Sequence, residues 1–403
     1  MILLLGVSGC AGLGDGSRAI PLGEPLGPAV HTTAEAAAEV RGDKDHPAGA
    51  GATAFPGGMA TDRYLIGDDV QGEVALSDVI VASFAPMQGL AFGDVDGDGQ
   101  IDGLFLDYAG FADNGSTCAG TTYLLPGPLT GDLGAENARA SASTQTGEEC
   151  GGDALYSPDL DGDGAPDLVV VQAGARSEEL AVWPAAATGV LTDPAVLVSG
   201  LDIWQWHPVN GDVDGDGIDD LFLESANVGA LRFDGPLTAT RPAGTADATI
   251  TGTIAPFRLG DVDGDGLPEI VGAEADGSVR VVPGTAPSGS LRDLAVASIL
   301  PESATTMPWY LDLAVADLDG DGAAEILLGV DATASPGGVG GIWYYDGPFV
   351  GDRTYGEGDA RWVAADGGPA LSANVAVDGA DRIWAWEAWS STLSGAFWVF
   401  DLP

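Results

Sequence analysis

The sequence predicts an all-β protein folded as a β-propeller of four-stranded blades, with six blades expected and seven as the alternative. Three observations predict this fold. A unit of about 50–60 residues recurs along the chain. Each unit holds four short runs rich in β-branched and aromatic residues and bounded by Gly, Pro and Asp. No segment shows an apolar stripe at helical spacing.

The order of segments within a unit is constant. A short apolar run such as GLAFG or APFRLG leads into an acidic loop, and a β-type run such as LVVVQ follows. A third run often closes with a Gly-Pro turn, as in ALRFDGPL, and a weaker fourth run ends the unit. The acidic loops begin at residues 94, 159, 212, 261 and 317. Five complete units are therefore expected.

The two ends of the repetitive region are expected to complete the ring. The C-terminal stretch from NVAVDGADRIWAWEAWS to GAFWVFDLP supplies only three strands of a sixth unit. The run ALSDVIVAS at residues 75–83 has no unit of its own, and pairing it with the last unit would remove an exposed sheet edge. The segment YLIGDDV at residues 64–70 resembles a third strand, which leaves a partial seventh blade open.

Charge excludes two classes of partner. The chain has 403 residues, with 14 Lys+Arg against 61 Asp+Glu, which gives a net charge of −47. Such a chain repels nucleic acid and anionic membrane surfaces. Because 45% of the residues are hydrophobic and the acids are clustered, a disordered acidic chain is also not expected. Metal cations or basic partners fit better.

Each acidic loop has the form D-x-D-G-D-G-x-x-[DE], with carboxylates at positions 1, 3, 5 and 9. Calcium takes six to eight oxygen ligands in a flexible shell, and alternate residues of a tight loop can turn inward. Glycines at positions 4 and 6 permit the sharp turn. Position 7 varies in side chain, which indicates a backbone carbonyl ligand there. The sequence therefore predicts five Ca²⁺ sites.

The predicted ligands are grouped by loop position. Position 1 is Asp94, Asp159, Asp212, Asp261 and Asp317; position 3 is Asp96, Asp161, Asp214, Asp263 and Asp319; position 5 is Asp98, Asp163, Asp216, Asp265 and Asp321. Position 9 is Asp102, Asp167, Asp220, Glu269 and Glu325, and the position 7 carbonyls belong to Gln100, Ala165, Ile218, Leu267 and Ala323.

An EF-hand is excluded, because it needs a Glu at position 12 and flanking helices. Position 12 is Phe105, Val170, Leu223, Gly272 or Leu328, and the flanks are strand-like. The last unit, with Val377-Asp378-Gly379-Ala380-Asp381, lacks the alternating Asp triad, so no calcium is expected there.

This loop between two strands, at this spacing, resembles the FG-GAP or VCBS-type repeat. Such repeats form the calcium-binding β-propeller of integrin α-subunits and of many bacterial surface proteins. The resemblance implies a calcium-stabilised propeller whose loop-rich faces bind partners. It covers about residues 60–403, with five full matches to the loop.

The N-terminus is expected to be an export signal. The run MILLLGVSGC is too short to span a bilayer and resembles a bacterial lipobox ending at Cys10, the expected lipidation site, although no Lys or Arg precedes it. The expected organisation is signal peptide and lipobox over residues 1–10, flexible tether over 11–55 and propeller over 56–403. The remaining cysteines, Cys118 and Cys150, suggest one disulfide in an exported protein.

The residues favour binding over catalysis. The histidines are His31, His46 and His207, and the first two lie in the expected tether, so no His-based triad or zinc cluster is expected in the body. The tryptophan pairs are interpreted as packing between blades, with a sugar- or peptide-binding surface as the alternative. These tryptophans are Trp204, Trp206, Trp384 and Trp386, with Trp389 and Trp398 nearby.

We therefore predict a monomeric, non-catalytic binding or adhesion scaffold outside the cytoplasm, on the bacterial outer membrane or cell surface. Its expected partner is a protein or glycan, and its membrane contact is the lipid anchor alone. One alternative is a propeller-fold polysaccharide lyase or hydrolase with structural calcium, and another is a purely structural envelope component.

Overall fold

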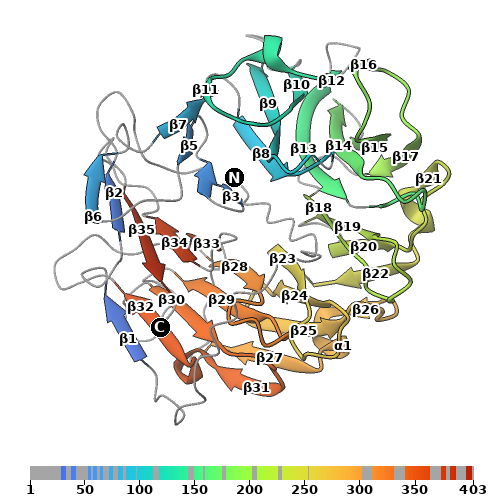
Figure 1. The fold of residues 1–403 in the computed structure, drawn as a ribbon. Helices are drawn as coiled ribbons and strands as arrows, with labels where there is room; N and C mark the ends of the chain where they lie inside the picture. Colours follow the sequence, from blue (N-terminus) through green and yellow to red (C-terminus); the bar gives the residue numbers. More distant parts are fainter. Residues whose placement is uncertain are drawn as a thin grey trace.

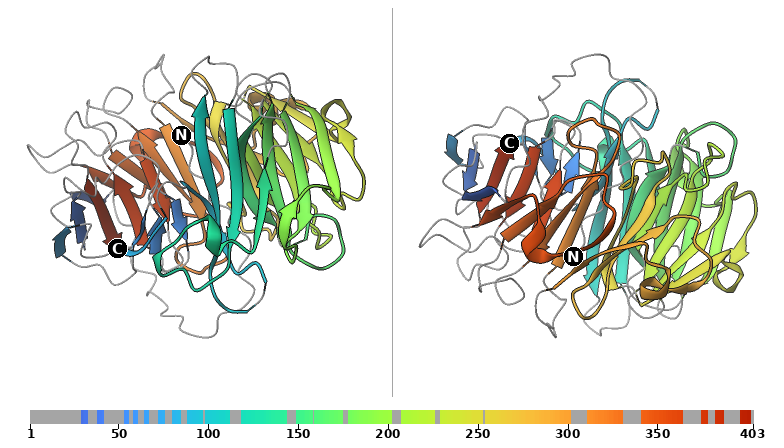
Figure 2. Two further views of the ribbon diagram at one scale, coloured as in Figure 1. Left: turned by 90° about the horizontal axis from the view of Figure 1, so that it is seen from above. Right: turned by 90° about the horizontal axis from the view of Figure 1, so that it is seen from below.

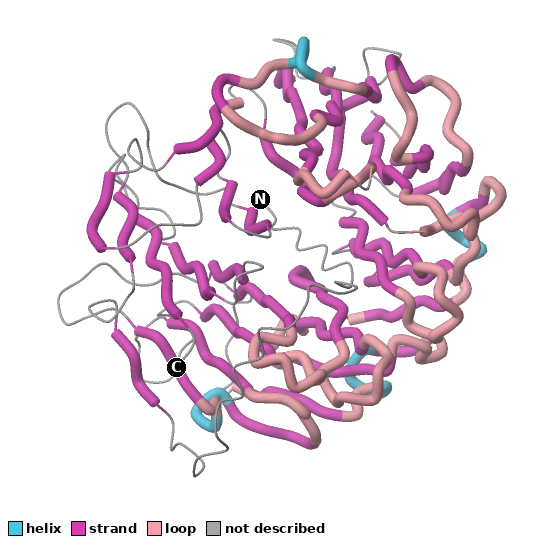
Figure 3. Tube along the Cα trace, in the orientation of Figure 1, coloured by secondary structure: helices cyan, strands magenta, loops and turns pink. Residues whose placement is uncertain are grey.

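The structure is a computed structural model of the chain. It describes residues 29–32, 38–41, 53–55, 58–60, 64–66, 72–75, 80–84, 88–96, 98–111, 118–143, 149–157, 159–174, 178–201, 207–225, 229–252, 254–301, 311–330, 341–363, 374–377, 382–386 and 396–401. Strands dominate these residues, and short helical turns lie at the outer edge (Figure 3). The prediction of an all-β fold is confirmed.

The described strands form seven five-stranded sheets arranged as a ring (Figure 1). Each sheet is a blade with four antiparallel strands and a short fifth strand that pairs in parallel at the outer edge. Seen from the side, the strands cross the thickness of the ring (Figure 2). This is the architecture of a β-propeller.

Blades are numbered in chain order, with strands given from the inside outward. Blade 1 is β3 (Thr53–Phe55), β4 (Gly58–Ala60), β5 (Tyr64–Ile66), β7 (Ile80–Ser83) and β11 (Gly131–Asp132). Blade 2 is β8 (Gln88–Gly93), β9 (Asp102–Phe111), β10 (Cys118–Leu125), β12 (Ala140–Ser143) and β16 (Gly189–Leu191). Blade 3 is β13 (Glu149–Ser157), β14 (Asp167–Gly174), β15 (Glu178–Pro184), β17 (Val196–Leu201) and β21 (Arg241–Pro242). Blade 4 is β18 (His207–Gly211), β19 (Asp220–Ser225), β20 (Gly229–Phe233), β22 (Ala248–Thr251) and β26 (Gly289–Ser290).

The ring continues with three further blades. Blade 5 is β23 (Ile254–Gly260), β24 (Glu269–Ala273), β25 (Val279–Pro283), β27 (Ala297–Leu300) and β31 (Gly351–Thr354). Blade 6 is β28 (Leu311–Ala316), β29 (Glu325–Val330), β30 (Gly341–Tyr345), β32 (Ala360–Val363) and β1 (Ala29–Thr32). Blade 7 is β33 (Asn374–Val377), β34 (Arg382–Trp386), β35 (Ala396–Asp401), β2 (Ala38–Arg41) and β6 (Gly72–Ala75). The helical turns are η3 (Ala135–Asn137), η4 (Ala243–Thr245), α1 (Leu291–Leu294) and η6 (Tyr355–Glu357).

Each fifth strand is borrowed from the next blade around the ring. In blade 3, for example, Val198 of β17 pairs with Arg241 of β21, which precedes the outer strand of blade 4. The N-terminal segment closes the ring in the same way. Its strand β2 pairs antiparallel with β35 at the C-terminal end and in parallel with β6. Strand β2 thereby covers the free edge of β35, and β6 covers the free edge of β2.

The hydrophobic core lies between the blades, in clusters that each join two neighbours. The second strands β24 and β29 are buried along their whole length, because a blade is packed on both faces. Their apolar β-branched and leucine side chains each contribute about 1.5–3 kcal/mol of burial free energy. The strand that follows each acidic loop is thus anchored in the core.

Three predictions about the ring and the ends of the chain differ from the structure. The described strands form seven sheets, one more than the six blades expected first, because β3, β4, β5 and β7 make a blade without an acidic loop. The run at residues 75–83 contributes β7 to that blade, whereas β2 closes the ring. The tether predicted over residues 11–55 contains β1, β2 and β3, so the propeller strands begin before residue 56. These strands have three or four residues, too few to show a periodic pattern.

Candidate metal centre

The five acidic loops connect the first strand to the second in blades 2 to 6. Four of the loops begin directly after the inner strand and the second begins one residue later, and each ends at the first residue of the buried second strand. Strand direction alternates within a blade and the blades share one topology, so the five loops lie on the same face of the ring.

The third loop illustrates how the motif folds. The carboxylate of Asp214 accepts a hydrogen bond from the Asp216 backbone N–H at 3.1 Å, and the Asp216 carboxylate accepts one from the Ile218 N–H at 2.9 Å. The Asp212 carboxylate accepts from the Gly217 N–H at 2.8 Å. Gly217 has φ 87°, a left-handed conformation that glycine adopts without strain. Aspartates at alternate positions thus form successive Asx turns that curl the loop around its carboxylates.

All five loops bring carboxylate oxygens together within 4.8 Å of one another. The groups are Asp94, Asp96 and Asp102; Asp159, Asp161 and Asp167; Asp212, Asp214 and Asp220; Asp261, Asp263 and Asp265; and Asp317, Asp319, Asp321 and Glu325. Positions 1 and 3 belong to every group, whereas four predicted carboxylate ligands lie outside them: Asp98, Asp163, Asp216 and Glu269. The position 7 residues donate their N–H groups to the position 5 carboxylates, and a ligand role for their carbonyls stays a prediction.

The acid at position 9 is buried in every loop. Its exposed fraction is 4% or less in Asp102, Asp167, Asp220, Glu269 and Glu325. One carboxylate oxygen accepts the backbone N–H of position 2, at distances from 2.6 to 3.0 Å. This repeated bond ties the start of each loop to the start of the second strand.

Burial is the main influence on the pKa of these buried acids. It raises the pKa of Asp167 and of Asp220 to about 6, that of Glu269 to about 7 and that of Glu325 to about 8. The pKa of Asp102 is raised for the same reason. Backbone hydrogen bonds oppose the rise, and nearby aspartates of the same loop add to it by charge repulsion. Without a cation, each loop therefore holds a carboxylate that resists ionisation.

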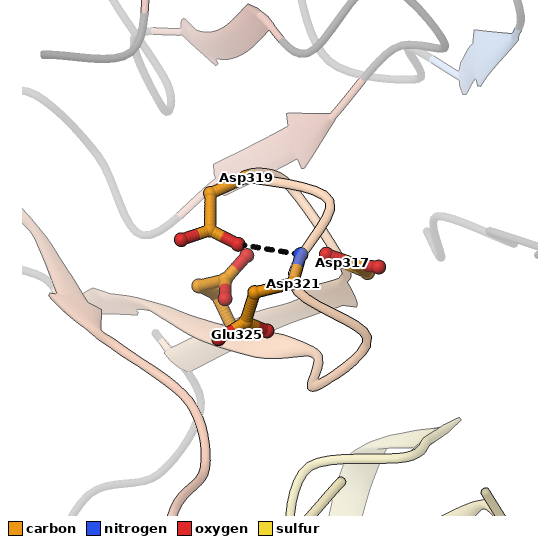
Figure 4. Close-up of side chains that lie close together, drawn as sticks. All are labelled: Asp317, Asp319, Asp321 and Glu325. Carbon is orange, nitrogen blue, oxygen red and sulfur yellow. Dashed lines mark hydrogen bonds between the residues drawn. The ribbon is translucent and has the colours of Figure 1, made fainter. Parts of the chain in front are cut away.

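The fifth loop contains a buried oxygen with no hydrogen-bond partner. Glu325 is 0% exposed, and its Oε2 accepts the Leu318 N–H at 2.6 Å, but its Oε1 has no partner. Figure 4 shows the Glu325 carboxylate beside those of Asp319 and Asp321, with Asp317 across the loop. A buried polar atom left unsatisfied is costly, so a ligand at this oxygen would stabilise the fold.

This donor set fits a hard divalent cation. Among the described residues, each of the five groups consists of Asp and Glu carboxylates and contains no His nitrogen or Cys sulfur of the kind that zinc and copper favour. A divalent cation would satisfy the orphaned oxygen of Glu325 and reverse the sign of the interaction among the four acids. The residues of the fifth loop therefore fit a calcium ion.

The first loop has a different environment, because a protein cation already contacts it. Arg139 donates to the Asp96 carboxylate at 2.5 Å, and the arginine side chain is only 17% exposed. The same guanidinium donates to the Ala185 carbonyl of blade 3 at 2.7 Å. Both oxygens of Asp102 accept backbone N–H groups, from Val95 at 3.0 Å and Gly127 at 2.7 Å.

Comparison with known families identifies the repeat. Residues 159–223 and 261–328 match the FG-GAP-like repeat family. The chain carries FG-GAP-like repeats. Each matched segment runs from one acidic loop through the next, so the first contains the second and third loops and the other contains the fourth and fifth. The predicted resemblance is confirmed at this level.

Solved structures similar to this FG-GAP-like repeat protein are distant. The WD40 domain of Toxoplasma gondii coronin has 9% identity and a TM-score of 0.47, covering 88% of this chain and 82% of that one. BBS1N in complex with ARL6DN has 9% identity and a TM-score of 0.41, covering 78% and 92%. The exotype rhamnogalacturonan lyase YesX has 12% identity and a TM-score of 0.38, covering 78% and 62%. No curated protein matches the chain.

Several other predicted residues of the FG-GAP-like repeat protein lie outside the described residues or are described only as backbone. The lipobox with Cys10, together with His46, Trp204, Trp206, Trp389 and the loop at residues 378–381, lies outside the described residues. The backbones of Cys118 and Cys150 lie in β10 and β13, and their pairing stays a prediction. The strands β1, β18, β34 and β35 contain His31, His207, Trp384, Trp386 and Trp398. No described helix of the chain is long and apolar enough to span a membrane.

Several contacts between the acidic loops and residues outside each motif were not predicted from the sequence. Arg139 contacts the first loop from 43 residues away, and its signal was only that arginine is rare in this acidic chain. The position 8 residues Asp219 and Ala324 hydrogen-bond to the preceding loops. The sequence does contain a pattern that could have predicted these bonds. Position 8 is proline in the second and fourth loops, whereas in the third and fifth loops it is a residue with an N–H that can donate.

Proposed function

We propose that this FG-GAP-like repeat propeller is a calcium-stabilised, non-catalytic binding scaffold that works outside the cytoplasm. The orphaned Oε1 of Glu325, buried beside three aspartates, is the observation that carries the calcium assignment. The other four loops repeat the same motif with their own carboxylate groups.

Calcium fits these loops better than magnesium does. Calcium accepts irregular shells of six to eight oxygens, whereas magnesium demands near-octahedral geometry and dehydrates reluctantly. The acidic loops offer carboxylates at alternate residues and exposed positions where water can complete a shell. Sites of this kind in extracellular modules bind at ~10⁻⁴–10⁻³ M, which suits a protein outside the cytoplasm.

The ion would act by joining elements that already lie together. The aspartates belong to the loop, while the acid at position 9 belongs to the buried second strand. Holding both ends of the loop on one cation fixes the hairpin between the two innermost strands of a blade. At a calcium concentration ten times Kd, each site adds about 1.4 kcal/mol of folding free energy.

The proposed binding role is based on two features of the acidic loops. Calcium binding would account for the clustered acids of the acidic loops. The acidic loops of five blades share one face of the ring. We propose a protein or glycan ligand for this molecule, with an N-terminal lipid anchor at Cys10 holding it to the cell surface.

Thermal unfolding tests the calcium assignment. The melting temperature should rise strongly between protein in excess chelator and protein in millimolar calcium, and magnesium at the same concentration should give a much smaller rise. Equal melting temperatures in chelator and calcium would refute the assignment.

Screening the calcium-loaded protein tests the binding role. In a screen against immobilised glycans and surface proteins, we expect the protein to bind one of them and to leave it chemically unchanged. Depolymerisation of a polysaccharide by the purified protein would instead favour a lyase or hydrolase.

A further inference from the structure

The second and third acidic loops are joined by backbone hydrogen bonds across the boundary between blades 3 and 4. The carbonyl of Asp159, at position 1 of the second loop, accepts the N–H of Asp219 at 2.8 Å. Asp219 directly precedes Asp220, the buried acid of the third loop. A ligand residue of one loop is therefore held by the neighbour of a ligand residue in the next.

A second bond runs parallel to the first. The carbonyl of Leu160 accepts the N–H of Leu237 at 2.9 Å, while its own N–H donates to the buried Asp167 at 2.9 Å. Two residues before Leu237, the N–H of Gly235 donates to the other oxygen of Asp220 at 2.8 Å. The buried acids of both loops are thus connected to the same short stretch of backbone.

The fourth and fifth loops are joined in the same way. The carbonyl of Asp261 accepts the N–H of Ala324 at 2.6 Å, one residue before Glu325. The carbonyl of Val262 accepts the N–H of Phe349 at 2.6 Å, and its N–H donates to Glu269 at 3.0 Å. The pattern therefore recurs after two blades.

The intervening boundaries are built differently. Position 8 is Pro166 in the second loop and Pro268 in the fourth, and proline has no N–H to donate to a preceding loop. Between blades 2 and 3 the Asp94 carbonyl instead accepts the hydroxyl of Tyr156 at 3.1 Å. Between blades 4 and 5, Arg232 donates to carbonyls of the turn at residues 284–286, which is not part of an acidic loop.

We infer that the cation sites form two coupled pairs, residues 159–167 with 212–220 and residues 261–269 with 317–325, and one independent site at residues 94–102. This inference rests on the proposed function, because it concerns how the calcium sites fill. Within a pair, calcium in either loop raises the affinity of the other. Between pairs, the sites fill independently.

The coupling follows from the shared backbone. A cation in the fifth loop fixes Glu325 and therefore the adjacent Ala324 N–H, which holds Asp261 and the start of the fourth loop. The fourth loop then loses less conformational freedom when its own cation binds, and its affinity rises. Linkage requires the reverse effect to be equal. The orphaned oxygen of Glu325 makes the fifth loop the strongest source of this coupling.

Single and double Asp→Asn variants at position 3 test the pairing. Asparagine can still accept the Asx-turn hydrogen bond, so the loop fold is kept while a ligand charge is lost. Asp263→Asn, Asp319→Asn and their double variant form the cycle for a linked pair. Asp214→Asn, Asp263→Asn and their double variant form the matched cycle for neighbouring loops that are not linked. Calcium titration calorimetry and the calcium-induced rise in melting temperature are the two readouts.

In the linked cycle we expect Asp319→Asn alone to raise the calcium Kd of the fourth loop by about fivefold or more. The loss of calcium affinity and of the calcium-induced rise in melting temperature should then be little larger in the double variant than in the single variants. In the unlinked cycle the losses should add. Additive losses in both cycles, or equal departures from additivity in both, would overturn the pairing.

Ala324→Pro provides a second test that leaves every carboxylate in place. It removes the N–H that joins the fourth and fifth loops, and the second and fourth loops already carry proline at this position. Five calcium ions should still bind, without coupling between these two loops. Retained coupling in this variant would contradict the inference. A wild-type protein that binds no calcium would instead refute the proposed function itself, so the two failures can be distinguished.

Discussion

The first and fifth acidic loops share one motif but differ in how far the protein satisfies their carboxylates. In the first loop, Arg139 contacts Asp96, and both oxygens of Asp102 accept backbone N–H groups. In the fifth loop, one oxygen of the buried Glu325 has no partner. The comparison teaches that the motif specifies where the acids lie, while residues of neighbouring strands and turns decide how strongly the loop depends on a cation.

The largest expected effect is on stability in calcium. Glu325→Gln removes the acid that most requires the ion, so the calcium-dependent part of the free energy of unfolding should fall by about 1.4 kcal/mol. Asp102→Asn should reduce the calcium-dependent part of the stability less, because Arg139 already neutralises part of the first loop. Chemical unfolding with and without calcium measures both. A larger calcium-dependent loss in Asp102→Asn would reverse the comparison.

In chelator the same two variants should change stability in opposite directions. Glu325→Gln replaces the orphaned oxygen with an amide that donates to the adjacent aspartates, so the metal-free protein should gain about 1 kcal/mol. Asp102→Asn places an amide against a backbone N–H and should lose about 1–3 kcal/mol. Urea unfolding in chelator provides the comparison, and a loss in both variants would show that the orphaned oxygen has no energetic cost.

The pH dependence of the metal-free protein sharpens the contrast. Burial raises the pKa of Glu325 to about 8 and that of Glu269 to about 7, so the folded state holds these protons more tightly than the unfolded chain does. Stability should therefore be greatest near pH 4–5 and decrease as the pH rises to about 8. In Glu325→Gln the stability should decrease less toward the upper end of this pH range. Melting curves in chelator across this range that show constant or rising stability would contradict the assignment.

The smallest expected effect concerns the affinity of the first loop. Arg139→Ala frees Asp96 for the ion and should lower the calcium Kd of that loop severalfold, although it also removes a bond to blade 3. Arg232→Ala is the control, because Arg232 likewise bonds to carbonyls of the next blade but contacts no loop ligand. Calcium titrations should separate the two variants. Equal affinity changes would mean that Arg139 acts through the fold alone.

The sequence predicted the parts of the molecule that depend on local patterns. The five loops and their positions on the first hairpin of blades 2 to 6 follow from a spacing repeated within a few residues, whereas four of the predicted carboxylates lie outside the groups that form there. Blade 1 was predicted only as the alternative of a partial seventh blade at residues 64–70, and the closing strand β2 was not predicted, because these strands are three or four residues long and pair with distant segments. Contacts such as that of Arg139 with Asp96 depend on how blades meet, which no local pattern encodes.

A crystal structure of the calcium-loaded protein with anomalous diffraction data tests the five calcium sites most directly. We expect five calcium peaks on one face of the ring, each among the carboxylates at positions 1, 3 and 5, with Glu325 Oε1 as a ligand in the fifth. Carboxylates of the acidic loops that surround only water at millimolar calcium would contradict this expectation.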